Sequence, residues 1–276
     1  MKIIQGILLI LFFSYHGFGG TTNIRTYLTG QKKGGEYRIR PLVNGVIIIG
    51  GVIADYYGVR ILKAKPGAPY HTVIGLSPAN VNAFDRGASR QNPAIRNSSK
   101  KTSDWLLDAS IALPGFLVFD TAIRKDALNV GIVYATTMMI MANAYAWGVG
   151  HIDRYRPYVY NTRESLAFRL SQGSRNSFYA GHVAATATAT FFGAKVYQDY
   201  NPKSGLVPWL YASAALPPAI VGYYRYRAGY HFPSDIIAGF AAGTTMGILI
   251  PQVHKIRNKN LSFYSTADGV GLTYHF

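Results

Sequence analysis

Five long apolar segments set the strongest limit on what this chain can fold into. They cover residues 105–123, 128–149, 182–196, 206–224 and 235–252. Three of them run for about 18–22 residues without a charge, which is long enough for a helix to cross a bilayer. The segments are also rich in Ala, Gly and Thr, and the mean hydropathy of the chain is only +0.08. We therefore predict an all-α bundle of about five to six core helices, either membrane-embedded or periplasmic.

The N-terminus is typical of an export signal. Lys2 is followed by an apolar run at 3–13 and by small residues at Gly17, Gly19 and Gly20. We expect residues 1–20 to be a signal peptide that is cleaved near Gly20.

Residues 21–104 are predicted to form an N-terminal extension with short elements. Its apolar centre at 46–54 is short for a membrane span, and 63–104 is rich in Pro, Asn, Ser, Lys and Arg. The main domain is expected over 105–255. The tail, 256–276, alternates apolar and polar residues around Ala267-Asp268-Gly269, which predicts a short β-hairpin.

The charge balance indicates an anionic partner. Lys and Arg number 28 against 12 Asp and Glu, a formal net charge of +16. Such an excess attracts nucleic acid, anionic lipid or phosphorylated substrates. We find no nucleic-acid-binding module and expect no nucleic-acid partner, so an anionic membrane surface or a phosphate ester is favoured. The chain has no cysteine, which removes disulfides, thiolate catalysis and cysteine-based metal sites.

Three polar stretches, 151–158, 177–182 and 225–235, stand at ends of the predicted helices. If consecutive helices run antiparallel, all three stretches share one face of the bundle. That arrangement gathers two histidines, several arginines and an aspartate, a combination that packing alone does not explain.

These stretches resemble the type 2 phosphatidic acid phosphatase and vanadium haloperoxidase superfamily. Its pattern is Lys-x6-Arg-Pro, then Pro-Ser-Gly-His, then Ser-Arg-x5-His-x3-Asp. The resemblance covers about residues 105–252, and the third motif is the most specific. The matching residues are Arg156-Pro157 in the first motif, Gly181-His182 in the second, and Arg225, His231 and Asp235 in the third.

The resemblance implies a metal-independent phosphatase that needs no cofactor and forms a phosphohistidine on His231. Asp235 would hold the other ring nitrogen, and His182 would protonate the leaving oxygen and later activate water. Phosphate would be bound by guanidinium groups and a helix-start amide, those of Arg156, Arg225 and Gly181.

The sequence departs from the family pattern at four positions. Val149 stands where the family has lysine, Tyr179 replaces proline, and Ala180 and Tyr224 replace the serines. Arg154 and Arg227 are the nearby candidates to supply the missing charge. A catalytically weakened relative is the alternative.

We expect an exported bacterial envelope protein that dephosphorylates membrane lipids such as phosphatidate, undecaprenyl diphosphate or a lipid A phosphate. With residue 21 outside the cytoplasm and 46–54 not crossing, five crossings would place the three stretches on the periplasmic side. The alternatives are a periplasmic acid phosphatase acting on small phosphate esters, a vanadate-dependent haloperoxidase, and a non-catalytic envelope protein that binds anionic lipid. The sequence gives no indication of the oligomeric state.

Overall fold

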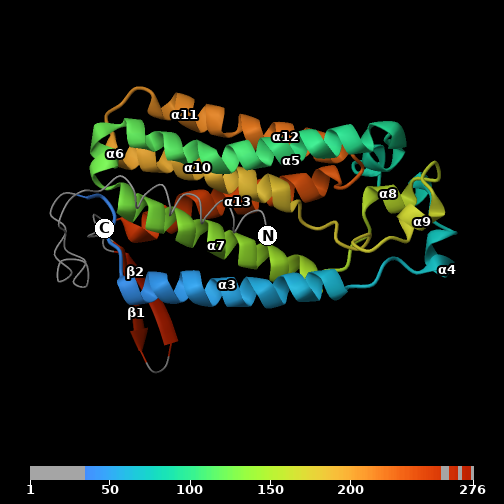
Figure 1. Ribbon diagram of the computed structural model, residues 1–276, viewed down its shortest axis with the longest axis horizontal. Helices are drawn as coiled ribbons and strands as arrows, with labels where there is room; N and C mark the ends of the chain where they lie inside the picture. Colours follow the sequence, from blue (N-terminus) through green and yellow to red (C-terminus); the bar gives the residue numbers. More distant parts are fainter. Residues whose placement is uncertain (1–34, 256–260, 267–268, 275–276) are drawn as a thin grey trace.

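The computed structural model describes residues 35–255 and two further segments, 261–266 and 269–274. The predicted signal peptide lies outside the described residues. Long helices run side by side along one axis, as Figure 1 shows, and confirm the all-α bundle. They are α3 (Pro41–Ala64), α5 (Arg96–Ala112), α7 (Ala127–His151), α10 (Gly181–Tyr200), α11 (Val207–Ala214), α12 (Leu216–Arg227) and α13 (Pro233–His254).

Short elements fill the connections. At the opposite end from the start of α3, two segments form what we call the headpiece, residues 65–95 and 152–180 (Figure 1). The headpiece contains α4 (Tyr70–Val73), η1 (Pro78–Asn80), η2 (Arg86–Arg90), η3 (Pro93–Ile95), α8 (Pro157–Tyr160) and α9 (Leu166–Arg169). The remaining short helices, η4 (Leu113–Phe119) and α6 (Thr121–Lys125), connect α5 to α7 at the other end.

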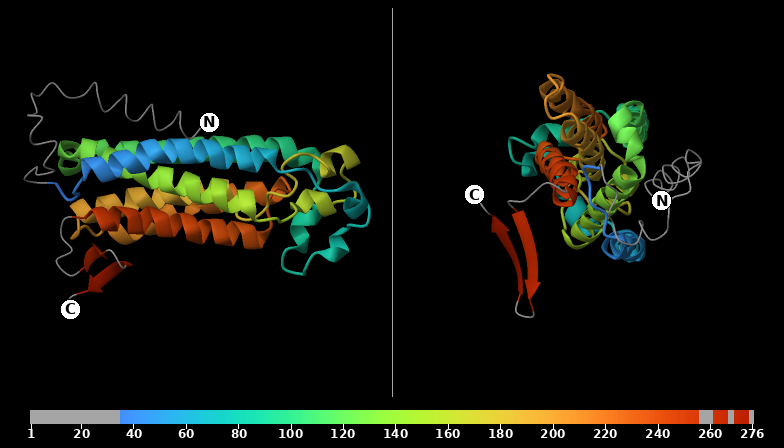
Figure 2. Two further views of the ribbon diagram at one scale, coloured as in Figure 1. Left: turned by 90° about the horizontal axis from the view of Figure 1, so that it is seen from below. Right: turned by 90° about the vertical axis from the view of Figure 1, so that its left-hand side faces the viewer.

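Helix α3 corrects the prediction made for 46–54. It is 24 residues long and, with α7 and α13, is one of three helices in the described residues that are long and apolar enough to cross a membrane. The helix continues past its apolar centre because its polar residues Asn44 and Asp55 point inward and are buried. Only 17% of the most apolar 18-residue stretch of α3 is buried, against 56% of the corresponding stretch of α7. The end-on view in Figure 2 shows α3 at the edge of the bundle.

Two segments predicted as single helices are each divided. The segment 105–123 belongs to α5, which begins already at Arg96, then to η4 with Pro114 near its start, then to α6. Asp120 caps α6 by accepting bonds from the backbone amides of Ala122 and Ile123. The segment 206–224 is split at Ala215, before Pro217 and Pro218, because proline removes a helical hydrogen bond.

The core lies between α7 and α10. Val133, Met138 and Met141 of α7 and Phe192 and Val196 of α10 are almost completely buried there. These two helices are therefore the fixed centre from which the headpiece loops extend.

Three glycines bring α13 against the backbone of α10. A Cβ atom at Gly239, Gly243 or Gly247 would lie 2.5, 2.2 or 2.6 Å from a backbone oxygen of α10 or of Ala180, which precedes it. The four-residue spacing puts all three glycines on one face, and small residues at such a face allow close helix contact. The amide of Ala180 donates to the carbonyl of Asp235 at 3.0 Å, so the starts of α10 and α13 are held together.

The two C-terminal strands are β1 (Leu261–Thr266) and β2 (Gly269–Tyr274). They pair antiparallel, with Leu261 opposite Tyr274 and Thr266 opposite Gly269. Their side chains lie outside the described residues.

Candidate active site

His231 lies in the turn between α12 and α13, and it is only 3% exposed. Gly229, with a φ of +69°, makes the turn that directs the chain away from α12. Nδ1 of His231 lies 2.7 Å from the carbonyl oxygen of Ser177. A carbonyl only accepts hydrogen bonds, so Nδ1 carries the proton and Nε2 keeps its lone pair. Burial, aided by the charges of Arg156 and Arg225, holds the pKa of His231 well below its usual value, which favours a neutral ring.

Asp235, in the first turn of α13, is fully buried, but its nearest carboxylate oxygen, Oδ2, is 3.9 Å from Nδ1 of His231. Oδ2 accepts instead from the Ser177 hydroxyl at 2.6 Å and from the Phe232 amide at 2.9 Å. The predicted direct bond from Asp235 to the ring is therefore replaced by an indirect one. Asp235 fixes the side chain of Ser177, and the carbonyl of Ser177 orients the imidazole.

Arg154 ties the headpiece to α13. One guanidinium nitrogen, Nη1, contacts Asp235, and the other, Nη2, donates to Asp85 at 2.8 Å. Asp85, in the headpiece, also accepts from the amide and the hydroxyl of Ser234, at 3.0 and 2.7 Å. Because two carboxylates already engage Arg154, it is placed to hold the loop rather than to replace the family lysine.

The other candidate for that charge, Arg227, lies apart from the site and donates to the hydroxyl of Tyr223 at 2.7 Å. Val149, at the family lysine position, is fully buried. Lys65 does reach the carbonyl of Val149, at 3.2 Å, but it also donates to the carbonyls of Ile152 and Arg175. Lys65 thus caps the end of α7, where cations are favoured by the helix dipole.

Arg156 and Arg225 are brought together as predicted. Their guanidinium carbons lie 5.0 and 5.5 Å from the centre of the Tyr230 ring, so one aromatic ring holds both cations. Arg225 is 4% exposed, and the Nε atoms of both arginines are buried without a hydrogen-bond partner. Unpartnered buried donors on cations are costly, and a bound anion would satisfy them.

His182 lies in the first turn of α10, directly after Gly181. A Cβ atom at Gly181 would be 2.3 Å from the ring of Tyr145, which explains why glycine opens this helix. Nε2 of His182 is 2.9 Å from Oδ1 of Asp104. Loss of hydration and the nearby Arg225 charge lower the pKa of His182 to about 4.

Sequence reasoning missed the residues that support this site. Asp104 and Asp85 both lie in the predicted N-terminal extension, 21–104, for which the sequence predicts no functional role. Ser177 and Tyr230 were seen as neighbours of the motifs, without a role. Their polar character alone gave no signal, because each acts through a partner at least 50 residues away or through a stacked ring.

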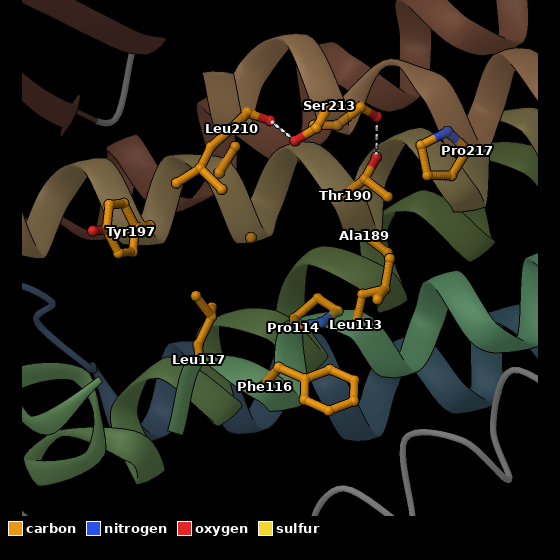
Figure 3. A pocket seen from close by; sticks show the side chains of 13 residues that line it. Leu113, Pro114, Phe116, Leu117, Ala189, Thr190, Tyr197, Leu210, Ser213 and Pro217 are labelled. Carbon is orange, nitrogen blue, oxygen red and sulfur yellow. Dashed lines mark hydrogen bonds between the residues drawn. The ribbon is translucent and has the colours of Figure 1, made fainter. Parts of the chain in front are cut away.

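An apolar pocket of about 350 Å³ lies elsewhere, between η4, α10 and α11 (Figure 3). Leu113, Phe116 and Leu117 line it on one side, and Leu210 and Ser213 line it on the other. Its lining has no charged side chain, so it is not suited to hold phosphate. In the part of the chain that the structure describes, no group of three or more His, Asp or Glu side chains is placed to hold a metal ion.

A buried imidazole with a free Nε2, a second histidine on an aspartate, and two cations with spare donors form an arrangement suited to phosphoryl transfer. The fold and the site define a helical bundle whose headpiece end carries a candidate phosphoryl-transfer site. Residues 126–259 match the family model of the PAP2 superfamily, in agreement with the motif resemblance, and this match supports phosphatase activity. No curated protein and no solved structure matches the chain. Asp85 and Asp104 both precede the matched residues.

Proposed function

We propose that this chain removes phosphate from membrane lipids such as phosphatidate, undecaprenyl diphosphate or a lipid A phosphate, through a phosphohistidine on His231. One observation carries the proposal: His231, with its lone pair on Nε2, shares a buried site with Arg156 and Arg225, whose Nε atoms lack partners. Guanidinium groups bind phosphate oxygens in pairs, so the substrate would satisfy these donors.

The proposed reaction has two steps. Nε2 of His231 attacks phosphorus while the bond to the leaving oxygen breaks, and that oxygen receives the electron pair and a proton from His182. A water molecule then attacks the phosphohistidine and gives its proton to His182, and the electron pair of the N–P bond returns to Nε2. Inorganic phosphate is released, and both histidines regain their starting protonation.

Two features favour a lipid over a small soluble ester. Three of the described helices, α3, α7 and α13, are apolar and long enough to cross a bilayer, and their large exposed side chains include Val46, Ile49, Ile237 and Leu249. The net charge of +16 favours an anionic membrane surface.

The length of α3 changes the topology argument. If α3 crosses the membrane, its start and the headpiece lie on opposite sides, so a periplasmic site requires a cytoplasmic start of α3. Five Lys and Arg residues stand in 21–40 before α3, whereas Lys65 is the only one in 65–84 after it. Positive charge next to a first span favours the cytoplasm. We therefore propose a periplasmic active site with residues 21–40 in the cytoplasm. Cleavage of a signal peptide near Gly20 would instead leave residue 21 in the periplasm, so this topology and the predicted cleavage exclude each other.

The test uses the full chain in detergent and a phosphate-labelled lipid. We expect release of inorganic phosphate and an acid-labile label on the protein after rapid quenching. His231→Ala should lose both, whereas His71→Ala, an exposed histidine on α4, should keep both. Equal turnover in the His231 variant would overturn the mechanism. Faster turnover of a small aryl phosphate than of every lipid tested, with no need for detergent, would favour the soluble acid phosphatase instead.

A further inference from the structure

Helix α5 brings a carboxylate into the site from outside the family-matched residues. Ser103, Leu107 and Ile111 are buried on the face of α5 that packs against α10 and α12. Asp104 follows Ser103 and lies at the edge of that face. The packing of α5 therefore directs Asp104 towards the first turn of α10 and the last turns of α12.

Asp104 contacts both a predicted acid and a predicted phosphate ligand. Its Oδ1 atom lies 2.9 Å from Nε2 of His182 and 2.9 Å from Nη2 of Arg225. Its other oxygen, Oδ2, accepts from Lys100 at 2.8 Å. The carboxylate is thus held from three directions, in a fixed orientation towards His182.

We propose that Asp104 is a positioning residue that orients His182 for proton transfer to the leaving group, an inference that rests on the proposed function. A carboxylate on Nε2 fixes the proton there, so Nδ1 is the nitrogen that exchanges its proton with substrate and water. The leaving oxygen takes the Nδ1 proton as its bond to phosphorus breaks. The attacking water returns a proton to Nδ1, and Nε2–H stays bonded to Asp104 throughout.

The charges around His182 explain why the site needs a carboxylate here. Arg225 on α12, Arg156 after α7 and His231 before α13 all face this region, with Tyr145 of α7 against Gly181. Lys100 adds a further positive charge on α5. The charges of Arg225 and Arg156 disfavour a protonated His182 imidazole, and Asp104 opposes them.

The test compares two substrates in one preparation of each variant. An alkyl phosphate has a poor leaving group that needs protonation, whereas p-nitrophenyl phosphate has a leaving group that departs without it. We expect Asp104→Asn to lower kcat/KM for the alkyl phosphate by about 100-fold and for p-nitrophenyl phosphate by at most about fivefold. The ratio of the two rates does not depend on the fraction of folded protein, so a partly unfolded variant still gives an answer.

A double-variant cycle completes the test. His182→Ala should also lower kcat/KM for the alkyl phosphate much more than for p-nitrophenyl phosphate. Adding Asp104→Asn to this variant should not change the ratio of the two rates further. Asp104→Glu should restore part of the alkyl phosphate rate. Equal losses on both substrates would overturn the inference, and so would a lower KM for both with an unchanged kcat, which would show that Asp104 merely competes with phosphate. If His231→Ala retains turnover, the proposed function itself fails, and this outcome is independent of the substrate ratio.

Discussion

Within the residues that the structure describes, both ends of the helical bundle bury charged side chains, but buried arginine donors without a partner lie only at the headpiece end. At the end opposite the headpiece, Asp199 accepts bonds from Lys195, Lys255 and the hydroxyl of Tyr37. At the headpiece end, Arg156 and Arg225 keep buried Nε atoms without partners. A network that satisfies its own charges stabilises the fold, whereas a network with spare donors is prepared for a ligand.

The largest expected effect is on stability, at the closed network. Asp199→Asn removes the counter-charge of two lysines, Lys195 and Lys255, and should lower the free energy of unfolding by about 3–5 kcal/mol. Turnover per folded molecule should not change. Thermal unfolding in detergent measures the loss of stability. Turnover per folded molecule is the steady-state rate divided by the concentration of active sites, found by titration. Asp153→Asn, which breaks the exposed pair with Arg175, is the control and should cost less than about 1 kcal/mol. A stable Asp199 variant would contradict the comparison.

At the open network we expect a loss of catalysis instead. Arg225→Ala should lower kcat/KM by about 100-fold, because a buried charge-assisted bond to phosphate contributes about 1.5–3 kcal/mol. Arg227→Ala, two residues further along α12, removes a side chain that donates to the hydroxyl of Tyr223 and should change kcat/KM less than about twofold. Steady-state kinetics on one lipid phosphate measures both. Comparable losses in the two variants would show that general surface charge, not the buried site, binds the substrate.

The pH dependence sharpens the roles of the two histidines. The pKa of His182 is lowered to about 4, so its protonated fraction falls about tenfold for each pH unit above that value. Burial also lowers the pKa of His231, which favours a neutral ring at the proposed nucleophile. We expect the rate of alkyl phosphate hydrolysis, divided by that of His182→Ala, to fall with rising pH between 5 and 7, by about tenfold per unit. Because the substrate ionises in the same way with both proteins, dividing by the rate of the variant cancels the effect of substrate ionisation. A rising or flat ratio would exclude His182 as the acid.

The smallest effect is expected where the headpiece supports the site. Asp85→Asn weakens the bonds to Arg154 and Ser234 but keeps the side-chain shape. We expect kcat to fall about fivefold, equivalent to about 1 kcal/mol, with KM unchanged. Asn82→Ala is the matched control, because it removes only neutral partners of Asp85: the amide donor to its carboxylate and the acceptor of its backbone N–H. A loss as large as that of Arg225→Ala would indicate that Asp85 contributes directly to phosphate binding.

The local pattern of the sequence determined the helices and the face they share. Apolar segments of helical length predicted the bundle, and the position of the three polar stretches at helix ends predicted that they share one face. Both follow from the helical period and from residues a few positions apart. The length of α3 escaped prediction, because only its apolar centre, 46–54, was counted, whereas the polar Asn44 and Asp55 on either side are buried within the same helix.

Only the tertiary structure decided which groups hold the site together. Asp104 meets His182 and Arg225 across 78 and 121 residues of chain, and Arg154 meets Asp85 across 69. It also decided that Ser177, rather than Asp235, contacts the ring of His231. A hydrogen bond depends on distances of a few tenths of an ångström, and those distances are set by how whole helices pack. The sequence by itself thus determined which residues stand next to His231 along the chain, while helix packing decided which groups it contacts in space.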